Sequence, residues 1–103
     1  MIEFNYPEAV PKDFTGVCKV LYDNTIRYYK DGALHRQDGP ACEYPNGSCV
    51  WFLNGKLHKE DGPAVKAKNN YKEYYYNDAW YSNIESDDEW VEKVRCLKLE
   101  IFK

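Results

Sequence analysis

An internal repeat constrains this chain more than any other feature of its sequence. Segment 35–41, His-Arg-Gln-Asp-Gly-Pro-Ala, recurs at 58–64 as His-Lys-Glu-Asp-Gly-Pro-Ala, a period of 23 residues from His35 to His58. A degraded copy lies upstream at 15–18, Thr-Gly-Val-Cys. Periods of about 20–50 residues are typical of stacked supersecondary units, whose terminal copies diverge because they cap the stack. The repeat therefore predicts a stack of similar units.

Turn signals keep the same period and predict what each unit is. Asn46-Gly47 stands between two alternating apolar runs and predicts a two-residue hairpin turn, because a type I′ turn needs positive φ at both central residues. Asp23-Asn24 and Asn69-Asn70 occupy the equivalent positions, and asparagine tolerates the left-handed region. We expect three hairpins, with arms at 17–22 and 25–30, at 41–45 and 48–53, and at 64–68 and 71–76. Asp31-Gly32 and Asn54-Gly55 are expected to lead the chain out of the second arm.

A two-residue turn would also decide which side chains face one another across a hairpin. It would place Cys42 opposite Trp51 in the second hairpin and Lys66 opposite Glu73 in the third. Because aromatic side chains opposite small ones would let successive hairpins pack together, we expect Trp51 and Phe52 to be largely buried.

Residues 82–103 do not follow the pattern of the repeats, and they predict a C-terminal helix. Ser86 and Glu89 fit a capping box, in which serine caps the first turn and glutamate follows three residues later. The apolar positions that follow have helical spacing: Trp90, Val94, Leu97 and Ile101. The alternative is a helix to about Arg95 and then a strand, since Leu97, Leu99 and Ile101 also alternate.

The predicted fold is mainly β: three stacked β-hairpins from 23-residue repeats, capped by a C-terminal amphipathic helix. Ten tyrosines and three tryptophans favour β structure, because flat side chains suit a pleated surface. A chain of 103 residues predicts one domain. Within it, 1–14 would be an N-terminal extension, 15–81 the hairpin repeats and 82–103 the helix.

Charge and hydropathy exclude several classes of partner. The formal net charge is −3, with no clustered basic face, so we expect no nucleic-acid partner. No apolar run approaches the roughly 20 residues that span a bilayer, so we expect no membrane partner. The first residues, Met1–Phe4, lack the basic and apolar regions of a signal peptide, which favours the cytoplasm.

The four cysteines do not predict a metal site. Cys18, Cys42, Cys49 and Cys96 contain no Cys-x-x-Cys pair and no zinc-finger spacing. We interpret them as small buried hydrophobic residues, and no disulfide is expected in a reducing compartment. A metal site that also uses the two histidines is the alternative.

The repeat resembles a known family. Segments 57–64, 51–55 and 11–16 are similar to the HRxDGPA-repeat proteins, small proteins of bacteriophages and large viruses that are related to the MORN-like repeats. The resemblance covers about residues 11–81, and it departs at Lys59, where arginine is usual, and in a third copy without the histidine and the Asp-Gly-Pro-Ala block. It implies stacked hairpins, a phage origin, action in the host cytoplasm, no enzyme activity and no cofactor. It also implies a host protein as partner.

The histidines are the first candidates for chemistry. His35 and His58 each precede an aspartate by three residues, but Ser48 and Ser82 stand in no nucleophile context, so we expect no catalytic residue. Because this arrangement follows the repeat, we predict that the histidines bond turns within or between repeats. We expect the aspartates, Asp38 and Asp61, to contact backbone N–H groups at the Gly-Pro corners.

The tyrosines are the second candidates. Ten of them exceed the capacity of so small a core, and exposed tyrosine and tryptophan favour interfaces. The third repeat departs most from the others, so we predict a non-enzymatic protein-binding module that inhibits a host enzyme or defence protein. Its binding residues would be Tyr71, Tyr75, Trp80 and Tyr81. The alternatives are a protein that sequesters an anionic nucleotide through His35, Arg36, His58 and Lys59, and a structural or assembly protein.

Overall fold

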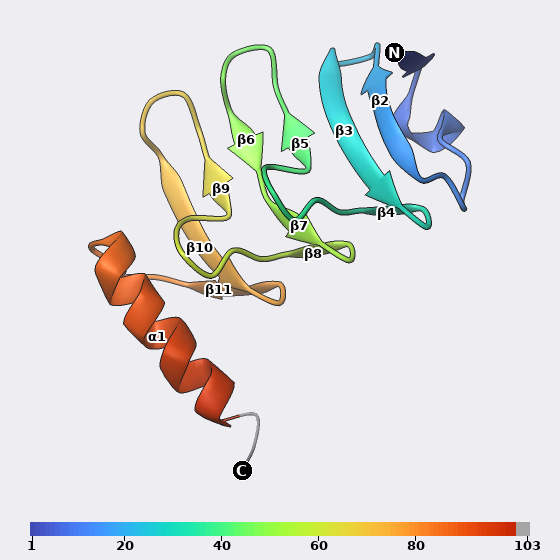
Figure 1. The fold of residues 1–103 in the computed structure, drawn as a ribbon. Coiled ribbons are helices and arrows are strands. Elements are labelled where there is room, and N and C mark those ends of the chain that lie inside the picture. The colour runs from blue at the N-terminus through green and yellow to red at the C-terminus, as the bar shows by residue number, and fades with distance from the viewer. Residues whose placement is uncertain (101–103) are drawn as a thin grey trace.

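The computed structural model describes residues 1–100, and it is mainly β with a single C-terminal helix (Figure 1). This confirms the predicted fold class. The elements are β1 (Ile2–Phe4), a 3-10 turn η1 (Pro7–Ala9), β2 (Gly16–Val20), β3 (Thr25–Lys30), β4 (Ala33–Leu34), β5 (Cys42–Glu43), β6 (Cys49–Val50), β7 (Phe52–Leu53), β8 (Lys56–Leu57), β9 (Val65–Lys66), β10 (Lys72–Tyr76), β11 (Ala79–Tyr81) and α1 (Asp87–Glu100).

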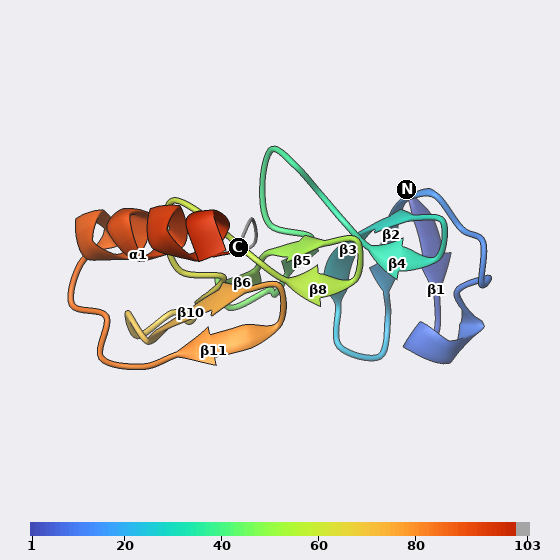
Figure 2. The same cartoon turned by 90° about the horizontal axis from the view of Figure 1, so that it is seen from below.

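Most strands form one long sheet in the order β1-β2-β3-β5-β6-β9-β10-β11, with β4 paired to β3, and β7 and β8 form a separate two-stranded sheet. Strands β2 to β10 follow one another antiparallel, and β1 pairs parallel with β2 at one edge. Hairpins are thus joined edge to edge, by β3 with β5 and by β6 with β9 (Figure 1). The connection that carries 35–41 rises from the sheet on the side where α1 lies (Figure 2).

Chain reversal occurs at Asn46-Gly47, but with a register one residue from the predicted one. Cys42 pairs with Val50, so the predicted pairing of Cys42 with Trp51 is wrong. The turn is a three-residue loop, in which the Gly47 N–H donates to the Tyr44 carbonyl at 3.1 Å and Gly47 has a φ of 91°. A glycine at this position forms a bulge after a type I turn, which adds one residue to the loop.

The third hairpin has the same one-residue shift. Lys66 pairs with Lys72 and Val65 with Glu73, so the predicted pair of Lys66 with Glu73 is also wrong. Asn70 takes the place of the bulge glycine, with a φ of 67°, and its N–H donates to the Ala67 carbonyl at 3.1 Å. Because side chains alternate along a strand, this shift decides which face each residue occupies.

Two-residue turns with positive φ at both positions occur at the second turn of each repeat. Asp31-Gly32, Asn54-Gly55 and Asn77-Asp78 close tight hairpins between β3 and β4, β7 and β8, and β10 and β11. The third of these pairs lacks a glycine, and its φ values of 48° and 71° are supplied by asparagine and aspartate. These residue types tolerate the left-handed region better than other non-glycine residues.

The core is small, and away from α1 it contains mainly small side chains. Cys18, Ala41 and Ala64, one per repeat, are all 0% exposed. Trp51 and Phe52 are only half-buried, so the prediction that they are largely buried is wrong. The reason is that α1 covers the sheet only at its C-terminal end, and within residues 1–100 no other helix covers the middle (Figure 1, Figure 2).

Helix α1 starts as predicted. The Glu89 N–H donates to the Ser86 hydroxyl oxygen at 3.1 Å, as in a capping box. Trp90 is 0% and Val94 is 4% exposed, and both pack against Tyr74 of the sheet. The helix continues to Glu100, so the alternative of a strand after Arg95 is wrong. The last predicted contact position, Ile101, lies outside the described residues.

Candidate functional site

The two histidines occupy equivalent places, and each bonds the turn of the following repeat. The ring Nδ1 of His35 accepts the Asn54 N–H at 2.9 Å, and Nδ1 of His58 accepts the Asn77 N–H at 3.0 Å. This confirms the predicted bonding of turns. An accepting Nδ1 carries no proton, so the neutral ring has its proton on Nε2.

Backbone carbonyls complete this support of the tight turns. The N–H groups of Gly32, Gly55 and Asp78 donate to the carbonyls of Phe14, Leu34 and Leu57 at 2.9, 2.8 and 2.8 Å. The first repeat has no histidine, and there the Thr15 hydroxyl makes the equivalent bond by accepting the Asp31 N–H at 2.8 Å. Every tight turn is therefore held by the segment that precedes it in the chain.

The aspartates of the repeated block do not have the predicted role. Asp38 and Asp61 have side chains that are 89% and 82% exposed, and they face Arg36 and Lys59 at 3.1 and 3.9 Å. The prediction that they contact backbone N–H groups is wrong. At the first corner the arginine makes the backbone contact instead, since its Nη1 donates to the Pro40 carbonyl at 3.2 Å.

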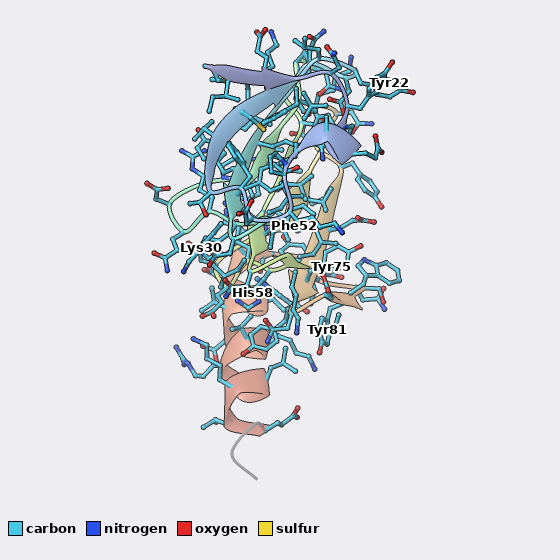
Figure 3. The ribbon with its side chains drawn as sticks, turned by 90° about the vertical axis from the view of Figure 1, so that its right-hand side faces the viewer. Tyr22, Lys30, Phe52, His58, Tyr75 and Tyr81 are labelled. Carbon is cyan, nitrogen blue, oxygen red and sulfur yellow. The ribbon has the colours of Figure 1, made fainter. Side chains whose placement is uncertain are left out.

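His58 also links the sheet to the helix. Its Nε2 lies 3.1 Å from Glu60 Oε2, while the other carboxylate oxygen, Oε1, pairs with Lys98 of α1 (Figure 3 shows where His58 lies). Burial of Glu60 opposes its ionisation, but the hydrogen bonds from Lys98 and His58 outweigh that effect and lower its pKa.

An open groove of about 820 Å³ separates the two repeated blocks. It is lined by Arg36, Gln37, Asp38, Gly39, Pro40, Trp51, Leu53, His58, Lys59, Glu60 and Asp61. The structure thus brings together three of the four residues predicted to hold an anion, and leaves out His35. Arg36 lies over the Tyr28 ring and Lys59 over the Trp51 ring, each 4.0 Å from the ring centroid.

The charges in this groove do not suit an anion. Arg36 already pairs with Asp38, and its Nη1 lies 3.7 Å from Glu43. Lys59 faces Asp61, and Nε2 of His58 faces Glu60. Arg36, Lys59 and His58 each already have a carboxylate partner, so binding an anion through them would require these pairs to break.

A second arrangement lies on β10 and β11. Because side chains alternate along a strand, Tyr71, Glu73 and Tyr75 share one face, and Trp80 lies opposite Tyr75 on that face. Tyr71 and Trp80 are 53% and 59% exposed. Glu73 accepts hydrogen bonds from the hydroxyls of Tyr71 at 2.6 Å and Tyr75 at 3.3 Å. We call Tyr71, Glu73, Tyr75 and Trp80 the aromatic face.

The fourth predicted binding residue, Tyr81, lies apart from the aromatic face. It pairs with Tyr74, and its ring packs 5.5 Å from that of Trp90 on the face that α1 covers. Figure 3 labels Tyr81 and Tyr75 near the end of the sheet. Glu73 was missed as a site residue, although its position midway between two tyrosines in an alternating strand was a usable signal.

The tyrosine hydroxyls beside carboxylates stay protonated. The hydrogen bond to Glu73 raises the pKa of Tyr71, and burial together with Glu73 raises the pKa of Tyr75. Burial and the hydrogen bond to Asp87 raise the pKa of Tyr74 to about 12. Each hydroxyl therefore acts as a donor that fixes its ring.

A groove of about 530 Å³ lies beside the aromatic face. Its walls come from β10, from the end of β11 and from the segment that leads into α1: Tyr71, Lys72, Glu73, Tyr74, Trp80, Tyr81, Ser82, Asn83, Ile84, Glu85, Ser86, Asp87 and Asp88. Asn83, in the segment between β11 and α1, has a left-handed φ of 63°. We call this groove the β10 groove.

Residues 1–100 contain no group of three or more histidine, cysteine, aspartate or glutamate side chains that could hold a metal ion. Cys18 and Cys42 are buried free thiols, and burial raises the pKa of each. No helix within this range is long and apolar enough to cross a membrane.

Comparison of the chain with protein-family models, with curated proteins and with solved structures finds no match.

Proposed function

We propose that this protein is a non-enzymatic module that binds a protein partner through the aromatic face. The observation that carries the proposal is that an exposed side chain is also held in place. Tyr71 is 53% exposed, and its hydroxyl donates a hydrogen bond to Glu73 at 2.6 Å. Tyrosine and tryptophan are enriched among residues that dominate binding energy. A ring that is already held in place loses little entropy when a partner covers it.

We infer further that the chain is a MORN-like repeat protein of bacteriophage origin, and that its partner is a host enzyme or defence protein in the host cytoplasm. Support for three structural repeats comes from the tight turns at 31–32, 54–55 and 77–78 and from the matched histidine bonds. The resemblance of the repeated block to phage proteins supports the origin and the partner.

The alternative of a nucleotide-sequestering protein has weaker support, because the cations in the groove between the repeated blocks are already paired with carboxylates. A structural or assembly protein would use the aromatic face against further copies of itself. Light scattering distinguishes that alternative, since it requires self-association of the purified chain.

The test is affinity capture from a lysate of the host bacterium. The variant combines Tyr71→Ser with Trp80→Ser, and the matched control is Tyr22→Ser, a 74% exposed tyrosine in the first hairpin. We expect the double variant to lose the partner that the wild type and the control retain, with unchanged unfolding by urea. Equal capture by all three proteins would contradict the proposal.

A further inference from the structure

The β10 groove contains an unpaired piece of strand edge. The carbonyls of Tyr71 and Glu73 accept N–H groups from the β9 side, from Ala67 at 2.8 Å and from Ala64 at 2.9 Å. Because successive residues of a strand point their backbone groups to opposite sides, the N–H and carbonyl of Lys72 point into the groove. Within the described residues, β11 ends at Tyr81, which pairs with Tyr74, so no strand pairs with Lys72 on this side of β10.

The sides of the groove combine exposed rings with negative charge. Its lining includes the carboxylates of Glu73, Glu85, Asp87 and Asp88, and Lys72 is the one cationic side chain among its lining residues. Exposed faces of tyrosine and tryptophan attract a cation, and carboxylates pair with it directly. The groove is therefore complementary in charge to a basic side chain.

We propose that the β10 groove binds an extended segment of the protein partner that carries an arginine or lysine. Its backbone pairs with Lys72 and so continues the sheet where β11 leaves it. The basic side chain of this segment lies against Tyr71 and Trp80. It pairs with Glu85 and Asp88, two exposed acidic residues near the N-terminus of α1. This inference rests on the proposed function and names the class of partner segment.

The experiment uses defined peptides with the full-length protein. The probe is acetyl-Thr-Val-Arg-Val-Thr-amide, and its matched control has glutamate in place of arginine. We expect the arginine peptide to shift the amide resonance of Lys72 and the indole resonance of Trp80, and its affinity to fall on raising the salt from about 0.05 to 0.5 M. Equal binding of the two peptides, or no binding of the arginine peptide, would overturn the inference.

A pair of protein variants tests the charges. Glu85→Gln with Asp88→Asn should weaken binding of the arginine peptide by about fivefold, as expected for the loss of two exposed ion pairs. The control combines Glu3→Gln with Glu8→Gln, two exposed acids at the other end of the sheet, and should bind as the wild type does. Equal binding by both variants would overturn the charge assignment.

These results are separable from the proposed function. If the Glu85→Gln, Asp88→Asn variant captures the host partner as well as the wild type, while the Tyr71→Ser, Trp80→Ser variant does not, the groove inference fails and the aromatic face stands. If neither variant loses the partner, both proposals fail.

Discussion

The indole N–H of Trp90 donates to the backbone carbonyl of Lys59 at 2.7 Å. The same ring packs 5.4 Å from Tyr74. One repeat earlier, the position of Tyr74 is held by Trp51, which the Lys59 side chain covers. The third repeat has Ser82 in the position of Lys59, so it has no basic side chain to cover Tyr74, and Trp90 of α1 takes that place. The helix thus substitutes for the missing part of the repeat.

Trp90 should therefore be the most costly aromatic residue to remove. Trp90→Ala deletes a fully buried ring and a buried hydrogen bond, and we expect it to lower the free energy of unfolding by about 3–5 kcal/mol. Trp51→Ala, at a half-buried site, should cost less than half as much. Urea denaturation measures both values, and a larger loss for Trp51→Ala would contradict the assignment.

His58 should matter more to stability than His35. His58→Ala leaves the Asn77 N–H without its acceptor at a part-buried site and removes a partner of Glu60, which we expect to cost about 1–3 kcal/mol. His35→Ala exposes the Asn54 N–H to water and should cost less. Urea denaturation gives the two losses, and hydrogen exchange should show faster exchange of the Asn77 amide in the first variant alone. Equal losses would refute the distinction.

Acid should weaken the attachment of α1. The pKa of Glu60 is lowered in the folded protein, so its contribution to stability is present above the unfolded value of about 4.3 and is lost as the pH falls through the folded value. We expect Tm to fall below about pH 4.3 with a shallower slope in Glu60→Gln. Melting curves from pH 3 to 7 measure the slopes, with the exposed Glu3→Gln as control, and identical slopes for wild type and Glu60→Gln would contradict the prediction.

Nucleotides should not stabilise the protein. A ligand at free concentration L that binds the folded state stabilises it by RT ln(1 + L/Kd) and so raises Tm, which means that a site for ATP would appear in a thermal-shift measurement. Because Arg36 and Lys59 are paired with carboxylates, we expect no change in Tm with about 1 mM ATP. A rise that Arg36→Ala abolishes would instead support the nucleotide-sequestering alternative.

Features that depend on local chemistry could be predicted from the sequence. The capping box at Ser86 and the reversal at Asn46-Gly47 follow from preferences of a few adjacent residues, and both predictions are confirmed. The register could not be predicted in the same way, because Asn-Gly fits both a two-residue turn and the last two positions of a three-residue loop.

The shift in register also explains why part of the candidate site was missed. Glu73 was expected opposite Lys66, and a paired lysine would have engaged its carboxylate. It lies opposite Val65 instead, and its carboxylate is available to the hydroxyls of Tyr71 and Tyr75. Tyr81 could not be assigned to a face until its pairing with Tyr74 was known.

Because each tight turn is bonded by the segment before it, the turns can form in order from the N-terminus to the C-terminus. Residues 14–15 hold the turn at 31–32, residues 34–35 hold the turn at 54–55, and residues 57–58 hold the turn at 77–78. As the chain emerges from the ribosome, the acceptors at 14–15, 34–35 and 57–58 are therefore synthesised before the turn N–H groups that donate to them. Each tight turn can therefore form as soon as it is synthesised, because the segment that accepts its hydrogen bonds is already present.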